Sequence, residues 1–356
     1  MSTTILDFRT RRELQAAHAL WKRYRPAAAP FAFKARTAAE ARAWQRRTRA
    51  ALAKAMGLDA LHTTCALKPK LVERVDKGGY LREKILLRTG PDALMPVYLL
   101  LPKKARRPLP AVLAFHGHGY GAKEIVGLWE DGNERATPDG YQRDFAIELC
   151  ARGFAVAVPE ISCFGERQTD FSHLNTAIGQ GVPYTCTHAS MLAFHLGVSV
   201  PGMRVHDGMR LADYLETRRE IDMARLGAMG ISGGGMHTMF STCIDTRIKA
   251  CVISGYYSAF KDSILAMAHC VCNIVPGMWR FGEMRDLIGL VAPRPVLIEA
   301  GSYDPIFPIK AVKRAVTEAE RVYAVFSAQG KVETDYFEGR HRINGAMAYD
   351  FLSREL

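Results

Sequence analysis

Residues 226–235 read LGAMGISGGG, a short apolar run that ends in a serine between glycines, and this stretch decides the fold. A short, continuous apolar run is typical of a strand buried inside a parallel sheet. Gly230, Ser232 and Gly234 match the pattern G-x-S-x-G, and a helical pattern follows them. A serine on so sharp a turn needs glycine two residues away on either side, because a Cβ there would collide with the adjoining strand or helix. The stretch therefore predicts that Ser232 is a nucleophile exposed on a tight turn.

The alternation of apolar runs and helical patterns extends to both sides of this turn, from about residue 110 onward. The expected strands are 111–115, 154–158, 226–231, 250–253, 295–298 and 332–337. The expected helices are 141–152, 204–217, 234–244, 309–325 and 345–352. Strands that alternate with helices predict an α/β fold with a mostly parallel, doubly wound central sheet flanked by helices. In such a sheet ligands bind beyond the carboxyl ends of the strands, so a functional site is expected in the loops there.

The first part of the chain has a different pattern. Thr37 and Glu40 have the spacing of a capping box, and the helical pattern that begins there ends at Gly57. Strand patterns then follow, as in an antiparallel opening to the sheet, at 71–75, 80–87 and 96–101. We therefore expect an N-terminal helical extension at residues 1–68 that packs on the core, and a catalytic domain at residues 69–356.

One connection in this pattern is unusually long. Residues 162 to 201 are irregular and too many for an ordinary link between a strand and a helix. The segment follows a strand, so it would lie over the edge of the sheet where the site is expected. We expect a lid-like insertion that shapes the substrate pocket.

A serine hydroxyl is a weak nucleophile and needs an imidazole base, which a carboxylate in turn orients. Asp304 lies in the loop after the expected strand 295–298, and His341 lies in the loop after 332–337. Both loops are at the carboxyl ends of parallel strands, where Ser232 also lies. The order of these residues predicts a Ser232, Asp304, His341 triad.

Other candidates for the base and the acid have less suitable positions. His237 is on the helix that leaves the turn, so that helix would carry it away from the serine hydroxyl. Asp335 falls inside the last strand, and Asp262 follows a different strand from the one expected to carry the acid. The triad assignment therefore rests on Asp304 and His341.

An oxyanion that forms during acyl transfer needs two N–H donors that are already in place. The backbone N–H of Gly233, directly after the nucleophile, is the expected first donor. The second should come from the loop HGHG that follows the strand 111–115. We expect the N–H of His118 to serve, with Gly119 as the alternative.

Three further side chains are candidates for contact with the substrate. Tyr120 follows the HGHG loop, and Glu166 begins soon after a strand, although a surface ion pair explains Glu166 equally well. Trp279 would form an apolar wall, and a packed cap helix is the alternative explanation for it.

The composition is that of an ordinary globular protein, with 48% hydrophobic and 24% charged residues. The net charge of +12 raises the question of nucleic acid, but the basic residues are dispersed, so a solvated basic surface is expected instead. No apolar run reaches about 18 residues, and the N-terminus lacks the apolar region of a secretion signal. These patterns predict a cytoplasmic protein with neither a nucleic-acid nor a membrane partner.

The eight cysteines lack the regular spacing of a disulfide scaffold. His269, Cys270 and Cys272 look superficially like one corner of a metal site, but zinc needs a second ligand pair, and none follows at a readable spacing. Buried thiols, and no metal, are therefore expected.

Together these motifs resemble a family, the bacterial dienelactone hydrolase-like and acetyl xylan esterase-like α/β-hydrolases. The resemblance extends from about residue 44 to the C-terminus and rests on HGHG, FGER, GISGGG, DSILAMAHCVCNIVPG, EAGSYDPIFP and FEGRH. It implies the α/β-hydrolase fold and a carboxylic-ester hydrolase, often a deacetylase, that needs no cofactor. It also implies that the HCVC stretch recurs as scaffold near the site. Dienelactone hydrolases themselves use a cysteine nucleophile, so that activity does not carry over to a chain with Ser232.

We therefore predict a serine esterase for short acyl or acetyl groups, which acts through an acyl-enzyme on a small-molecule ester. The same triad would serve an amidase, peptidase or thioesterase, because it sets the nucleophile and not the leaving group. A non-catalytic basic scaffold that binds nucleic acid is the alternative from another class, and the complete triad order argues against it. The sequence leaves open whether the chain forms a homo-oligomer.

Overall fold

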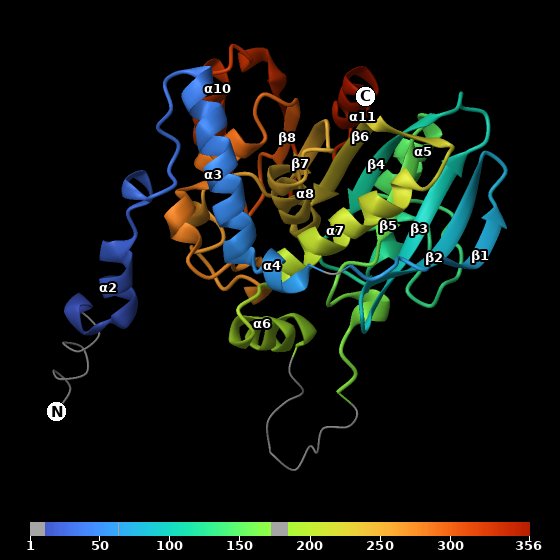
Figure 1. Ribbon diagram of the computed structural model, residues 1–356, viewed down its shortest axis with the longest axis horizontal. Coiled ribbons are helices and arrows are strands. Elements are labelled where there is room, and N and C mark those ends of the chain that lie inside the picture. The colour runs from blue at the N-terminus through green and yellow to red at the C-terminus, as the bar shows by residue number, and fades with distance from the viewer. Residues whose placement is uncertain (1–10, 63, 172–183) are drawn as a thin grey trace.

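A nine-stranded sheet runs through the middle of the molecule (Figure 1). The computed structural model describes residues 11–62, 64–171 and 184–356. The strands lie in the order β1-β2-β3-β5-β4-β6-β7-β8-β9. Their bounds are β1 Lys70–Asp76, β2 Tyr80–Gly90, β3 Ala93–Pro102, β4 Leu109–Phe115, β5 Ala155–Pro159, β6 Ile221–Ile231, β7 Ala250–Ser254, β8 Val296–Gly301 and β9 Val332–Phe337.

The first three strands pair antiparallel and form one edge of the sheet, with β1 at the right in Figure 1. β3 also pairs antiparallel with β5, and from β5 to β9 every neighbouring pair is parallel. This arrangement confirms the predicted α/β fold with its antiparallel opening. It also brings the carboxyl ends of β4, β6, β8 and β9 to a common edge.

Helices cover both faces of the sheet. The helices are α2 Ala16–Arg23, α3 Ala38–Met56, α4 Leu58–Leu61, α5 Phe145–Ala151, α6 Thr185–His195, α7 Val200–Glu216, α8 Gly233–Ile244, α9 Met284–Leu287, α10 Ile309–Ala324 and α11 Ala348–Glu355. Leu113 and Phe115 of β4 point into the core shared with α3, α7, α8 and α10, whereas Val112 and Ala114 point into the core shared with α5 and α11. This alternation is the two-residue period of a strand buried on both faces.

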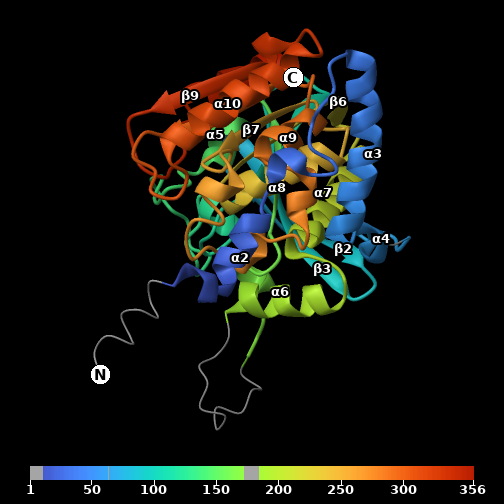
Figure 2. The same ribbon diagram turned by 90° about the vertical axis from the view of Figure 1, so that its left-hand side faces the viewer.

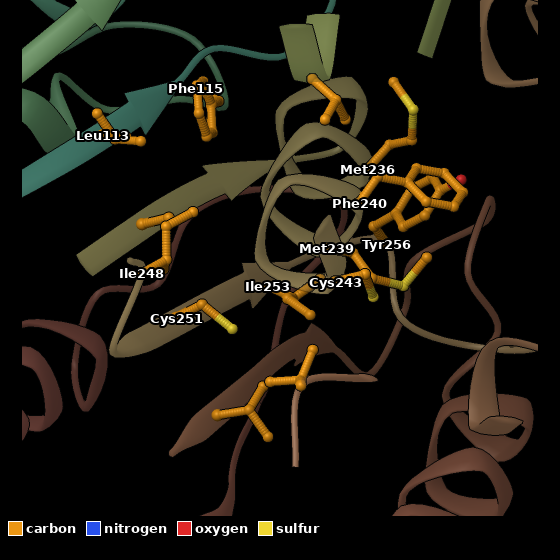
Figure 3. Packing of buried hydrophobic residues seen from close by; sticks show 14 of the residues in the cluster. Leu113, Phe115, Met236, Met239, Phe240, Cys243, Ile248, Cys251, Ile253 and Tyr256 are labelled. Carbon is orange, nitrogen blue, oxygen red and sulfur yellow. The ribbon is translucent and has the colours of Figure 1, made fainter. Parts of the chain in front are cut away.

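Helix α8 lies in the centre of the larger core. Figure 3 shows Met236, Met239 and Phe240 of α8 in the same cluster of buried side chains as Ile253 of β7. Each of these side chains has 0% exposure. The helix that leaves the turn is therefore fixed by packing along its whole length, which holds its first residue in place.

The N-terminal helix α3 begins and ends as its sequence predicts. Thr37 and Glu40 form a complete capping box, and Gly57 takes a left-handed conformation with φ 80° at the other end. Figure 2 shows α3 along one side of the molecule, beside α7. Arg49 of α3 donates hydrogen bonds to the carbonyls of Cys243 and Leu290, so the helix is tied to the core through polar contacts.

Two helix boundaries differ from the prediction for a backbone reason. α5 begins at Phe145 and not at 141, because Arg143 and Asp144 have φ of 53° and 48° and cannot belong to a right-handed helix. α11 begins at Ala348 and not at 345, since Gly345 has φ 74°.

The lid-like insertion predicted at 162–201 is only partly described, because residues 172–183 lie outside the described residues, as do 1–10 and 63 of the predicted extension. The prediction of irregular structure is wrong for 185–195, which form α6. The apolar residues of α6 do not gather on one face, so the sequence pattern gave no helical signal there. In the described part of the chain, no helix is both long and apolar enough to cross a membrane, and a cytoplasmic location stays a prediction.

Candidate active site

The turn between β6 and α8 carries Ser232 in a strained conformation. Ser232 has φ 58° and ψ −119°, a backbone region that side chains rarely adopt. A Cβ added at Gly230 would overlap the carbonyl of Gly234, and one added at Gly234 would overlap the carbonyl of Phe115. Glycine is thus required at both positions, for the steric reason expected from the sequence.

Asp304 and His341 meet beside this turn. His341 Nδ1 lies 2.6 Å from Asp304 Oδ2. The other carboxylate oxygen, Oδ1, accepts hydrogen bonds from the backbone N–H groups of Ile306 at 2.8 Å and Phe307 at 3.1 Å. Three donors therefore orient the buried carboxylate and, through it, the imidazole ring.

Two aromatic rings stack on the ring of His341. Tyr141 stacks on it with ring centroids 5.5 Å apart, and Phe307 stacks with centroids 5.9 Å apart. A Cβ added at Gly255 would lie 2.8 Å from His341 Cε1, and the residue before it, Ser254, accepts a backbone hydrogen bond from Ser232. The ring thus lies next to the turn, and its Nε2 has no hydrogen-bond partner among the described residues.

Tyr141 also lies at the site, although no sequence motif indicates it. Its hydroxyl donates to the carbonyl of His118 at 2.7 Å and interacts with the side chain of Ser232. Burial raises the pKa of Tyr141, so the hydroxyl stays protonated and remains a donor. The sequence pattern placed Tyr141 at the start of a helix, and only the fold turns it toward the serine.

The HGHG loop after β4 lies against the start of α8. A Cβ added at Gly233 would lie 3.0 Å from His118 Nδ1 and 4.0 Å from the His118 backbone nitrogen. At Gly119, the alternative donor, a Cβ would overlap the carboxylate of Glu124. The backbone amides of Gly233 and His118 are therefore neighbours.

The buried side chains of His116 and Glu160 form hydrogen bonds that hold this loop in place. His116 Nε2 accepts the N–H of Ile161 at 3.1 Å, so its Nδ1 carries the proton and donates to the Gly117 carbonyl at 2.8 Å. Glu160 accepts the N–H of Ala122 at 2.9 Å. The loop conformation thus depends on buried polar groups at the ends of β4 and β5.

The three side chains predicted to contact the substrate have partners other than the triad. The Tyr120 hydroxyl donates to the Leu128 carbonyl at 3.0 Å, and Glu166 forms an ion pair with Lys84 at 2.7 Å. Trp279 is 45% exposed and lines a separate cavity with residues such as Tyr24. The structure therefore places Asp304 and His341 beside the turn of Ser232, and His118 beside Gly233, but it does not bring these three side chains to them.

The alternative candidates for the base and the acid interact with other residues. His237 is buried on α8 and stacks on Phe115 with ring centroids 3.6 Å apart, and burial lowers its pKa. Asp335 accepts a hydrogen bond from Asn344 at 3.0 Å, and Asp262 pairs with Arg314 at 2.9 Å.

The fold gathers three cysteines and one histidine that are not neighbours in the sequence. The sequence showed no second ligand pair for Cys270 and Cys272, but the fold brings His118 and Cys186 to them, and His269 is not part of the group. The ligand atoms of these four residues all lie within 4.8 Å of one another. These residues come from three segments far apart in the chain, so no local spacing indicates the group.

The chain is similar to known hydrolases along most of its length. It matches the model of the Abhydrolase family over residues 7–336. A Bacillus subtilis (strain 168) protein with the name "Putative hydrolase YtaP" is 28% identical over 271 residues, which cover 71% of this chain and 83% of that protein. The carbohydrate esterase MZ0003, from an unknown prokaryotic organism, is 24% identical over 327 residues, which cover 78% of this chain and 71% of that protein.

A solved structure supports the same fold. It is that of a "putative acetyl xylan esterase" from Bacteroides fragilis NCTC 9343, with a TM-score of 0.74 and 19% identity over 91% of this chain and 82% of that chain. The recognition of an α/β-hydrolase from the sequence motifs is confirmed by these matches. The chain belongs to the Abhydrolase family.

Proposed function

We propose that the chain is a serine carboxylic-ester hydrolase that removes short acyl groups, acetyl above all, from a small hydroxylated substrate such as an acylated sugar. The observation that carries this proposal is the hydrogen-bonded pair of His341 and Asp304 beside the strained turn of Ser232. Acyl transfer uses a serine hydroxyl as nucleophile, an imidazole as its base and a carboxylate that orients the imidazole.

The reaction has two steps. Ser232 Oγ attacks the ester carbonyl carbon while His341 Nε2 takes the hydroxyl proton and Asp304 stabilises the resulting imidazolium. The N–H groups of Gly233 and His118 donate to the oxyanion of the tetrahedral intermediate. The C–O bond to the alcohol then breaks as His341 returns the proton to the leaving oxygen. Water, activated by His341, attacks the acyl-enzyme in the same way and releases the carboxylic acid.

The names of similar proteins, and not the triad, favour an ester as the substrate over an amide or a thioester. Two of the similar proteins have names that specify a substrate bond, and both names specify esters of carbohydrates. The triad itself would serve all three bonds. The proposal therefore predicts a much higher kcat/KM for p-nitrophenyl acetate than for p-nitroacetanilide, and the opposite preference would assign the chain to the amidases.

The first test is the nucleophile. Ser232→Ala should abolish hydrolysis of p-nitrophenyl acetate and leave the thermal unfolding midpoint nearly unchanged, because the side chain is small. Ser353→Ala on α11, which removes only a hydrogen bond to the Tyr349 carbonyl, is the matched control and should retain activity. A fluorophosphonate probe, mapped by mass spectrometry, should label Ser232. Undiminished turnover in Ser232→Ala would overturn the assignment.

The second test concerns the acyl group. A panel of p-nitrophenyl esters from acetate to octanoate should give the highest kcat/KM at the short end, and peracetylated monosaccharides should release acetate. A preference for the long esters would contradict the short-chain part of the proposal, while the labelling of Ser232 would still support the hydrolase.

A further inference from the structure

Next to the oxyanion loop lies a cluster of three thiols and one imidazole. Cys270 Sγ is 3.1 Å from Cys272 Sγ, and Cys272 Sγ is 3.5 Å from His118 Nε2. Cys186, in the first turn of α6, completes the group, and all four ligand atoms lie within 4.8 Å of one another. The cluster therefore joins three separate segments: the loop after β4, α6, and the residues around the short helix η7 (Val271–Asn273).

The donor set and its dimensions fit a tetrahedral zinc ion. Zinc binds thiolate sulfur at about 2.3 Å and imidazole nitrogen at about 2.0–2.1 Å, so neighbouring ligand atoms of a tetrahedral site lie roughly 3.5–3.8 Å apart. The two distances above are within less than 1 Å of these values. Three sulfurs and one nitrogen form the Cys₃His set of a structural zinc site. All eight cysteines are free thiols, so these sulfurs are available as ligands.

A buried arginine provides an independent argument. Arg204 is 1% exposed, and its guanidinium interacts with the thiols of Cys163, Cys186 and Cys272. One nitrogen donates to the Ser162 carbonyl at 3.2 Å, whereas Nε and Nη1 have no hydrogen-bond partner among the residues that the structure describes. Within the same residues Arg204 forms no ion pair with a carboxylate. A buried cation is costly without a counter-charge.

The three thiolates of a zinc site would supply that counter-charge. Three thiolates carry three negative charges and zinc two positive ones, so a Cys₃His zinc site has a net charge of minus one. Arg204 would neutralise this charge in the interior. Apart from the thiols, the partners of Arg204 among the described residues are the Ser162 carbonyl and the ring of Phe164, whose centroid lies 5.4 Å from the guanidinium carbon, and neither carries a full negative charge.

We propose that His118, Cys186, Cys270 and Cys272 bind one zinc ion in a closed, structural site. The four protein ligands leave no open position for water or substrate, so the ion is not a catalytic Lewis acid. It ties α6 and the segment around η7 to the loop that carries the His118 amide. His118 would bind zinc through Nε2, which leaves Nδ1 toward Gly233. The site itself does not depend on the proposed esterase activity.

The metal content of the full chain tests the proposal directly. Protein equilibrated with ZnCl₂ and then dialysed should contain about one zinc ion per chain by inductively coupled plasma mass spectrometry. Cys272→Ala and Cys270→Ala should lose most of that zinc, whereas Cys150→Ala should retain it, because Cys150 is a buried cysteine on α5 outside the cluster. Wild-type protein without zinc would overturn the proposal, as would equal zinc in Cys272→Ala.

Cobalt gives a readout that does not depend on how well a variant folds. Co²⁺ added to metal-free wild-type protein should produce the thiolate charge-transfer and intense visible bands of a tetrahedral sulfur-rich site, and ZnCl₂ should abolish them. Weak absorption typical of octahedral Co²⁺ would overturn the proposal. Ser232→Ala should lose esterase activity and keep its zinc, so failure of the hydrolase proposal and failure of the metal proposal are distinguishable.

Discussion

At the residue scale, the site combines one strained residue with partners that hold it in place. Ser232 lies at φ 58°, and its backbone N–H donates to the carbonyl of Ser254 at 3.0 Å. Strain of this kind persists only where the surrounding structure determines the conformation. Close packing at Gly230 and Gly234 provides that constraint.

Tyr141→Phe tests the hydroxyl that the fold brings to the serine. The variant keeps the ring that stacks on His341 and removes the donor to the His118 carbonyl. A lost hydrogen bond of about 1–2 kcal/mol corresponds to roughly a 5- to 30-fold lower kcat/KM for p-nitrophenyl acetate. Tyr184→Phe, at an 85% exposed position, should leave kcat/KM unchanged. A Tyr141→Phe enzyme with full activity would show that the hydroxyl has no positioning role.

Asp304→Asn tests the support of the base. The amide retains one acceptor for the Ile306 and Phe307 N–H groups but cannot stabilise an imidazolium. We expect kcat to fall by about 10³-fold or more, with a small change in the unfolding midpoint. A decrease of less than tenfold, measured by steady-state kinetics, would contradict the role of Asp304.

At the element scale, Glu299 joins strand ends to the loop before α11. Its Oε1 accepts from Ser254 Oγ at 2.7 Å, and its Oε2 accepts from the Gly345 N–H at 2.6 Å. Burial raises the pKa of Glu299 above its ordinary value of 4.5, although these hydrogen bonds oppose the shift. The carboxyl group therefore connects β8, β7 and the C-terminal region. Its contribution to the free energy of unfolding depends on pH.

The sign of this dependence leads to a prediction. A carboxyl whose folded-state pKa is raised stabilises the fold below its unfolded pKa, and this contribution is lost as pH rises through the raised value. The free energy of unfolding of Glu299→Gln, relative to wild type, should therefore increase from pH 4 to pH 8. Urea denaturation at each pH measures it, and the exposed Glu338→Gln is the control. A difference that stays constant with pH would contradict the prediction.

At the scale of the whole molecule, the N-terminal extension shares the core of the hydrolase domain. Trp44 of α3 is 6% exposed, belongs to the larger core cluster, and donates from its indole N–H to the Phe31 carbonyl at 3.0 Å. A Cβ added at Gly289 would lie 2.9 Å from the Trp44 ring, so the ring packs directly on the domain.

Trp44→Ala should therefore destabilise the entire chain. We expect a loss of about 3–5 kcal/mol in the free energy of unfolding, and a single transition in both proteins, because a shared core makes unfolding cooperative. Guanidinium denaturation followed by tryptophan fluorescence and circular dichroism measures both quantities. Two separate transitions in wild-type protein would show that the extension folds independently.

Part of the positive charge of the chain belongs to arginines that stabilise the fold. Arg294 donates to five backbone carbonyls at the end of α8 and beyond, those of Thr242, Asp245, Ile248, Leu290 and Val291. Arg247 pairs with three carboxylates, those of Asp213, Glu216 and Asp245. These arginines satisfy internal groups and are not free to form a surface for phosphate.

The sequence by itself determined the parallel sheet, the turn at Ser232 and the order of Ser232, Asp304 and His341. Local periodicity and short motifs encode strands, helices and the loops between them, so these features are readable without a fold. The tertiary structure alone decided the place of Tyr141 and the grouping of His118 with Cys186, Cys270 and Cys272. His118 and Cys272 are 154 residues apart. Their contact depends on the order of the strands and on how loops from separate strands pack at one edge of the sheet, which no local pattern records.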